Sequence, residues 1–200
     1  DPALTGKTLG AMETDIYQFV QSYFATNIEN FDAVFRKSNL ATEIDALNTS
    51  ILNSTIDIKA SMRQEITINA LNTFTLSYPV KIATPDDILY RVQSSAFEFK
   101  GVVATIKNRL NSTVLQIVDL LDNVLLDNVG EYTPLTGTVA INAFEPSQIT
   151  TGQSFLIFSI VPEQSSFIKP LRNYILRLDT AKSSATATVD RQTTSLEVTV

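Results

Sequence analysis

The side chains that could carry chemistry in this chain are acidic, because the most versatile catalytic residues are missing. The 200 residues include no His and no Cys. This excludes a Ser-His-Asp triad, a thiolate nucleophile and a zinc–thiolate site. The most compact acidic pair is Asp86-Asp87, which follows Thr84-Pro85. We expect this pair to begin a turn or helix, since neighbouring residues of a strand point to opposite faces and cannot converge on one metal ion.

A second acidic group lies further along the chain at Asp119, Asp122 and Asp127. Calcium ligands are conceivable here, but the one-residue spacing and the glycine of an EF-hand loop are missing. We therefore interpret these residues as polar positions of a hairpin turn. The six glycines are isolated, so there is no Gly-rich phosphate-binding loop. The sequence indicates no catalytic, cofactor or metal site, and a hydrolase with two carboxylates is the remaining enzymatic alternative.

Four tyrosines suggest a different kind of function. They could line a sugar-binding groove, which would suit a surface β-domain that binds glycan or a host receptor; they are Tyr78, Tyr90, Tyr132 and Tyr174. The chain has no Trp to reinforce such a groove. Binding of glycan or receptor is therefore kept as the alternative to a structural role.

Charge and hydropathy narrow the set of partners. The net charge is -6, and Arg36-Lys37 is the only adjacent pair of cations, so we expect no nucleic-acid partner. No apolar stretch approaches the roughly 20 residues of a membrane-spanning helix, so we expect no membrane partner. The chain opens on Asp1-Pro2 without a basic and apolar leader. We interpret it as a processed chain or a fragment.

The elements that must position these residues fall into two regions. Apolar residues recur at three- and four-residue spacing from Ile16 to Phe24, which predicts a helix that Thr8 or Thr14 could cap. Further helical segments are expected around residues 28–35 and 40–52. Near Asn53 the period changes from 3.6 to 2, which predicts strands. The expected strands cover residues 56–63, 74–82, 97–100, 113–119, 124–129, 139–143, 155–161, 174–179, 185–190 and 196–200. Residues 112–129 also fit one face of a helix, but their β-branched residues and the short turn 121–123 favour two strands.

The arrangement of these strands can also be anticipated. The loop 69–73 predicts that the first two strands form a hairpin, and Pro79 predicts that the second lies at an edge. Residues 155–161 are apolar on both faces, which indicates a central strand. We expect an α+β fold with an N-terminal helical segment followed by mainly antiparallel β-structure of meander or sandwich type. The expected domains are a helical segment plus β-hairpin over residues 1–83 and a mainly β subdomain over residues 84–200.

Several local phrases occur together in a recognisable order. They are Phe31–Leu40, Ile44-Asp45, Ile51–Ser54, Val129–Tyr132, Thr136–Ile141 and Pro170–Leu176. Over about residues 15–190, this succession resembles the C-terminal part of the large baseplate wedge protein of T-even-like contractile-tailed phages. The broader class is the J-like baseplate wedge family.

The resemblance implies a role without a reaction. Such wedge proteins self-associate, bind other wedge subunits and form a ring around the hub, which reorganises when the tail contracts. For this chain it implies a homodimer, a higher ring in the assembled particle, and other baseplate wedge proteins as partners. It also implies a location in the tail baseplate of the virion, after assembly in the host cytoplasm. It transfers no catalytic residue and no cofactor.

Two groups of residues are the candidates for the interface. Aromatic side chains are favoured anchors at protein contacts, and the edge of a sheet can pair with another chain. The aromatic candidates are Phe19, Tyr23, Phe24, Phe31 and Phe35. The edge-strand candidates are Leu196, Val198 and Val200.

Overall fold

The computed structural model describes residues 6–150, 152–170 and 174–189, which form two compact units. The first unit lies within Asp1–Ile56 and Pro170–Val200, and the second within Asp57–Lys169. These units differ from the expected division at residues 83 and 84, because residues 57–83 contribute strands to the sheet of the second unit. Among the described residues, no helix has the length and apolar character needed to cross a membrane.

The first unit is built on helix α2 (Leu9–Tyr23), which the π-helix η1 (Phe24–Ile28) continues. Thr8 caps α2 as expected, since its Oγ1 accepts a hydrogen bond from the Ala11 N–H at 3.3 Å. The two-residue strand β1 (Phe35–Arg36) and helix α3 (Lys37–Asp45) follow. In this unit, Leu40 and Ile44 lie on the buried face of α3.

Two helix predictions in this unit need correction. The helix expected around residues 28–35 is wrong, because the chain leaves helical geometry after Ile28 and Asp32 has a φ of 61°. The helix expected over residues 40–52 begins earlier, at Lys37, and ends at Asp45. Ile28 and Phe35 are both buried, so the apolar spacing marked buried residues correctly while the backbone between them is not helical.

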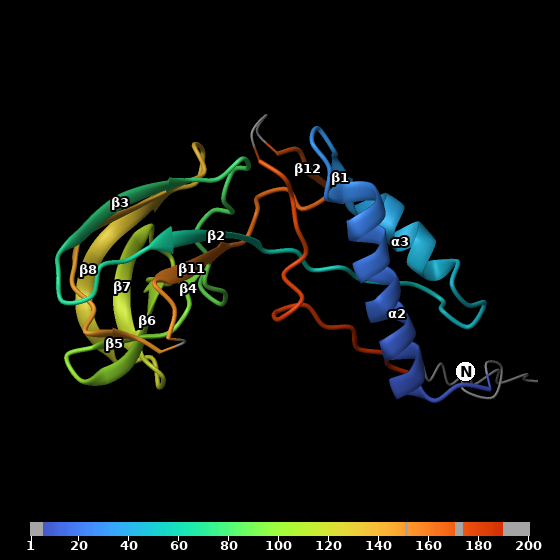
Figure 1. Cartoon of the computed structure of the whole chain (residues 1–200), viewed down its shortest axis with the longest axis horizontal. Coiled ribbons are helices and arrows are strands. Elements are labelled where there is room, and N and C mark those ends of the chain that lie inside the picture. Colours follow the sequence, from blue (N-terminus) through green and yellow to red (C-terminus); the bar gives the residue numbers. More distant parts are fainter. Residues whose placement is uncertain (1–5, 151, 171–173, 190–200) are drawn as a thin grey trace, which may run out of the picture. The chain divides into compact units, whose positions relative to one another are not determined.

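Residues 174–189 complete the first unit beside α2 (Figure 1). The Tyr17 hydroxyl donates a hydrogen bond to the Thr180 carbonyl at 2.7 Å, and the Ala187 N–H donates one to Glu13 Oε1 at 2.9 Å. The strands expected over 174–179 and 185–190 are wrong over their described residues, which form no regular secondary structure beyond a turn. The strand expected over 196–200 lies outside the described residues.

The second unit is a curved antiparallel sheet of ten strands (Figure 1). The strand order is β2-β11-β4-β6-β7-β8-β9-β3, with β5 paired to β6 and β10 paired to β5. The strands are β2 (Ala60–Glu65), β3 (Asn72–Ser77), β4 (Val92–Ser94), β5 (Phe97–Phe99), β6 (Val102–Asn108), β7 (Val114–Asp119), β8 (Val124–Thr133), β9 (Thr138–Phe144), β10 (Gln148–Ile149) and β11 (Phe155–Ile160). The short strand β12 (Phe167–Ile168) follows. The expected α+β fold is confirmed.

The core of the second unit lies on the inner face of the curved sheet. Alternate residues of each strand face inward, and those of β11 (Leu156, Phe158 and Ile160) are fully buried. Burial of each such side chain contributes about 1.5–3 kcal/mol. β11 lies between β2 and β4, which confirms the expectation of a central strand over residues 155–161.

The pairing of the strands differs from the expectation at one place. The strands on either side of the 69–73 loop do not form a hairpin, since β2 pairs with β11 and β3 pairs with β9. β3 nevertheless lies at an edge of the sheet, as Pro79 predicted. The expected hairpin over residues 113–129 is confirmed by the pairing of β7 with β8.

Candidate functional site

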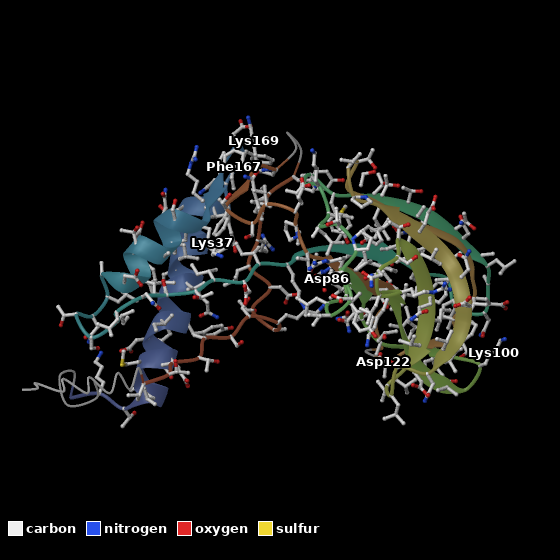
Figure 2. All side chains as sticks on the ribbon, turned by 180° about the vertical axis from the view of Figure 1, so that it is seen from behind. Lys37, Asp86, Lys100, Asp122, Phe167 and Lys169 are labelled. Carbon is white, nitrogen blue, oxygen red and sulfur yellow. The ribbon has the colours of Figure 1, made fainter. Side chains whose placement is uncertain are left out.

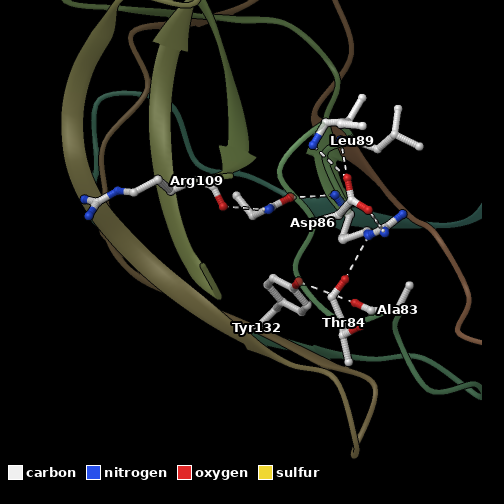
Figure 3. A network of polar contacts seen from close by, with 9 residues as sticks. Ala83, Thr84, Asp86, Leu89, Arg109 and Tyr132 are labelled. Atoms are coloured by element: carbon white, nitrogen blue, oxygen red, sulfur yellow. Dashed lines mark hydrogen bonds and ion pairs between the residues drawn. The ribbon is translucent and has the colours of Figure 1, made fainter. Parts of the chain in front are cut away.

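Asp86 is the centre of a polar network in the β-unit (Figure 3). Its Oδ1 accepts hydrogen bonds from the N–H groups of Ile88 at 2.7 Å and Leu89 at 2.9 Å. Its Oδ2 lies 2.9 Å from the Arg91 guanidinium, whose Nε donates to the Thr84 carbonyl at 2.9 Å. The two backbone hydrogen bonds, and then Arg91, hold the pKa of Asp86 below its usual range. An ionised carboxylate with these partners fixes the turn and is poorly suited to act as a general acid.

The other acidic candidates are also used in local structure. Asp122 pairs with Lys107 at 2.5 Å and Asp127 pairs with Arg109 at 2.5 Å. Figure 2 shows that Asp86 and Asp122 lie in separate parts of the β-unit. Within the described ranges, no group of three or more His, Cys, Asp or Glu side chains is placed to hold a metal ion.

Asp119 holds the tip of the β7–β8 hairpin in a fixed shape. Its Oδ1 accepts from the N–H groups of Leu121 at 2.8 Å and Asn123 at 2.9 Å, and its Oδ2 accepts from the Asn123 side-chain amide at 2.8 Å. These bonds, led by the one from the Asn123 side chain, lower the pKa of Asp119. The turn displays Leu121, which is 84% exposed, together with Leu120. Exposed leucines at an ordered tip are typical of a contact surface rather than of a catalytic site.

Asn108 is a buried polar residue that sequence reasoning missed. It is fully buried at the end of β6, where its Oδ1 accepts from the N–H groups of Arg91 at 2.6 Å and Val92 at 3.0 Å. Its side-chain amide donates to the Arg109 carbonyl at 2.9 Å. The sequence offers one sign of this burial, because Asn108 shares the alternation of the inward-facing residues Ala104 and Ile106. Asn108 ties the start of β4 to the end of β6 and has a structural role.

The four tyrosines differ in accessibility, and Tyr174 is 44% exposed. Tyr132 and Tyr78 are buried, and the Tyr78 hydroxyl donates to the Phe158 carbonyl at 2.7 Å. Burial raises the pKa of both phenols, that of Tyr132 to about 12. Tyr90 lies under the Lys107 ammonium at 4.6 Å. These contacts belong to the core and its border, and they leave two of the four expected sugar-binding rings inaccessible.

The aromatic candidates of the first unit divide into two groups. Phe19, Tyr23, Phe24 and Phe35 form a chain of ring contacts, with centroid distances from 5.5 to 6.2 Å. Phe31 is 68% exposed. The interface role of these rings stays a prediction. The edge candidates Leu196, Val198 and Val200 lie outside the described residues.

A shallow pocket of about 220 Å³ lies beside α2 in the first unit. Its polar lining residues include Lys7 and Asp15, whose side chains pair with each other at 2.6 Å. The remaining lining residues are Met12, Ile16, Leu47, Asn48 and Ile51. This lining offers few polar groups to orient a small ligand.

The two edges of the sheet differ in their protection. At β3, Pro79 follows the strand and the register shifts between Asn72 and Phe74. Both features hinder the addition of another strand. β2 has neither, and it pairs with β11 in an unbroken register from Ala60 to Glu65. Over the described strands, the sheet therefore has one protected edge at β3 and one open edge at β2.

Comparison with known proteins identifies part of the chain more closely. Residues 5–65 match the family model described as baseplate structural protein gp6, C-terminal domain III. The matched range runs from residue 5 through α2, η1, β1 and α3 to the last residue of β2. A search of the curated proteins finds no match.

The match confirms the resemblance to a baseplate wedge protein over residues 5–65. The expected extent of the resemblance, about residues 15–190, is larger than this range. The phrases at Val129–Tyr132, Thr136–Ile141 and Pro170–Leu176 lie beyond it. The ten-stranded sheet, apart from β2, is therefore not part of the matched segment.

Proposed function

We propose that this chain is a structural component of a phage tail baseplate wedge. The observation that carries the proposal is the match of residues 5–65 to a domain of a baseplate structural protein. The structure supports it through the local roles of the candidate acidic residues, since Asp86 and Asp119 each fix a turn by accepting backbone hydrogen bonds. The chain acts by holding partners in place, and we assign it no catalytic activity and no cofactor.

The partners follow from the same proposal. The chain self-associates as a homodimer, binds other wedge subunits and contributes to the ring around the hub, which assembles in the host cytoplasm and takes part in contraction. Phe31 is the aromatic residue best placed for such a contact, because its side chain is 68% exposed while Tyr23 and Phe35 are buried. The segment with Leu196, Val198 and Val200 remains a second proposed contact. The net charge of -6 supports protein partners over nucleic acid.

A depletion experiment tests this role. Phage that carry this chain are grown with its synthesis blocked, and the particles are examined by negative-stain electron microscopy. The proposal expects heads to form without complete baseplates, and expects the intact gene supplied in trans to restore complete tails. Complete, contractile tails in the absence of the chain contradict the proposal. Supply of the unrelated variant Asn142→Ala, at an exposed site of β9, serves as a control for expression.

A further inference from the structure

We propose that the free edge of β2 pairs with β2 of a second copy of this chain, in an antiparallel register centred on Ala60. This inference rests on the proposed self-association and names the surface that produces it. It would join two β-units into one continuous sheet.

The backbone of β2 offers a row of hydrogen-bonding groups that point away from β11, of which the Glu65 carbonyl accepts from the side-chain amide of Gln64 at 3.1 Å. Ile157 of β11, and Val161, the residue that follows the strand, bond toward β4, since the Ile157 carbonyl accepts from Ser95 N and Val161 N donates to the Arg91 carbonyl. Phe158 and Ile160 alternate with these residues and therefore bond toward β2, where they pair with Met62 and Ala60. The remaining residues of β2 point their N–H and C=O groups away from the sheet. These are Ser61, Arg63 and Glu65.

No partner strand covers these groups in the described part of the chain, where β2 pairs with β11 alone. β2 begins at Ala60, and residues 56–59, which form no strand by themselves, continue its alternation of half-buried and exposed side chains. The proposed pairing extends the strand over these residues. Inward residues at the edge are also less covered than those of β11. Met62 is half-buried, whereas Phe158 is fully buried. An added strand would cover this apolar side.

The side chains on the outer face discriminate between registers of self-pairing. Along the strand they read Asp57, Lys59, Ser61, Arg63 and Glu65. Pairing centred on Ser61 places Lys opposite Arg and Asp opposite Glu, which is unfavourable. Pairing centred on Ala60 places Asp57 opposite Arg63 at two symmetric positions. Opposite charges in directly facing positions stabilise a strand pair, and like charges destabilise it.

The inner face agrees with the register centred on Ala60. There Met62 of one copy faces Ile58 of the other, again at two symmetric positions, and the two Ala60 residues face each other. A register centred on Met62 also places opposite charges face to face, Lys59 against Glu65, but it sets Ala60 opposite the polar Gln64 within the strand. The register centred on Ala60 brings Gln64 opposite Ile56, at the end of the pairing, and keeps apolar side chains together around its centre.

A charge-swap experiment on the whole 200-residue chain tests the register. Sedimentation equilibrium over a range of concentrations gives the dimer Kd for the wild type, Asp57→Arg, Arg63→Asp and the double variant. Each single change should weaken the dimer on the order of 30-fold, because two attractive pairs become repulsive. The double variant should recover the wild-type Kd within about threefold. A pairing centred on Ser61 would instead be strengthened by either single change, and that result overturns the inference.

A proline pair tests the edge itself. Ser61→Pro removes an outward N–H while the bonds to β11 remain, so the chain should fold and be monomeric. Thr75→Pro makes the same change at the β3 edge and should dimerise like the wild type. Circular dichroism confirms the fold of both variants. A dimer that Ser61→Pro leaves intact, or a wild-type chain that is monomeric at all concentrations, overturns the inference.

The oligomeric state of the chain and its requirement for complete baseplates together separate this inference from the proposed function. A monomeric chain that is required for complete baseplates contradicts pairing through β2 and leaves the structural role in place. A dimer with the predicted charge dependence that is dispensable for tails contradicts the structural role instead.

Discussion

Replacement of Asn108 by Ala should destabilise the β-unit strongly, because two backbone N–H groups lose their acceptor. The side-chain oxygen Oδ1 of Asn108 accepts hydrogen bonds from Arg91 N at 2.6 Å and Val92 N at 3.0 Å, and Val92 is fully buried. Each donor left unsatisfied in the interior costs about 1–3 kcal/mol. We expect Asn108→Ala to reduce the free energy of unfolding by about 3–5 kcal/mol, a large part of the 5–15 kcal/mol typical of a domain.

The assay combines equilibrium unfolding with hydrogen exchange. Urea titration followed by circular dichroism gives the change in unfolding free energy, and exchange of the Val92 amide reports on the site directly. Asn142→Ala, an exposed substitution on β9, is the matched control and should change stability by less than about 0.5 kcal/mol. A loss below about 1 kcal/mol for Asn108→Ala, with the Val92 amide still protected, would refute the reasoning that this amide closes the end of the sheet.

Three further predictions test the packing and the titration of the fold. Gly137→Ala should prevent or severely weaken folding, since an added Cβ would lie 2.2 Å from the Val80 carbonyl oxygen. The control Gly101→Ala has a similar positive φ but open space around the added Cβ, so it should cost only about 1 kcal/mol. Thermal melts of the two variants compare the effect of crowding at similar backbone geometry. Burial raises the pKa of Tyr132 to about 12 from an ordinary value near 10. The stability that the neutral phenol contributes is therefore complete below pH 10 and is lost as the pH rises from 10 through 12. Unfolding at fixed urea across this pH range should show the loss, and Tyr132→Phe should make the loss smaller. Phe35→Ala should lower the free energy of unfolding by about 3–5 kcal/mol, because the Phe35 ring is buried. Phe31→Ala should leave the melting temperature unchanged, because that ring is exposed, and should weaken association if the ring is interfacial. Equal melting temperatures for the two variants would contradict this difference in burial.

The sequence indicated which residues are buried more reliably than which elements pair. The apolar residues on both faces of the 155–161 segment predicted a central strand, and the turn at Asp122 predicted the β7–β8 hairpin. The period of two also located β2 and β3 but could not name their partners. β2 pairs with a strand that lies about 90 residues later, and no local signal reports such a distant partner.

The errors in the first unit have a related cause. Apolar spacing from Ile28 to Phe35 imitated a helix, yet the π-helix ends at Ile28, and Phe35 is buried from the short strand β1. Residues 174–189 alternate like a strand, but their described contacts include side-chain hydrogen bonds with α2 in place of a sheet ladder. Periodicity shows how side chains alternate and leaves open what receives the backbone hydrogen bonds.

The functional residues were predictable only in part. The absence of His and Cys directed attention to the carboxylates, and the structure explains Asp86 and Asp119 as turn-forming residues. The open edge of β2 was not anticipated, because an edge is defined by the strands that fail to pair with it. The charge pattern from Asp57 to Glu65 is visible in the sequence, but it acquires meaning only once β2 is known to end the sheet.

The structural role in a baseplate is tested most directly by locating the chain in the particle. Intact virions and isolated tails are labelled with gold-conjugated antibodies raised against this chain, and serum adsorbed with the purified chain serves as the control. The account predicts specific label at the baseplate, at the end of the tail distal to the head. Label confined to the head or the fibres, or purified virions that lack the chain, would contradict it.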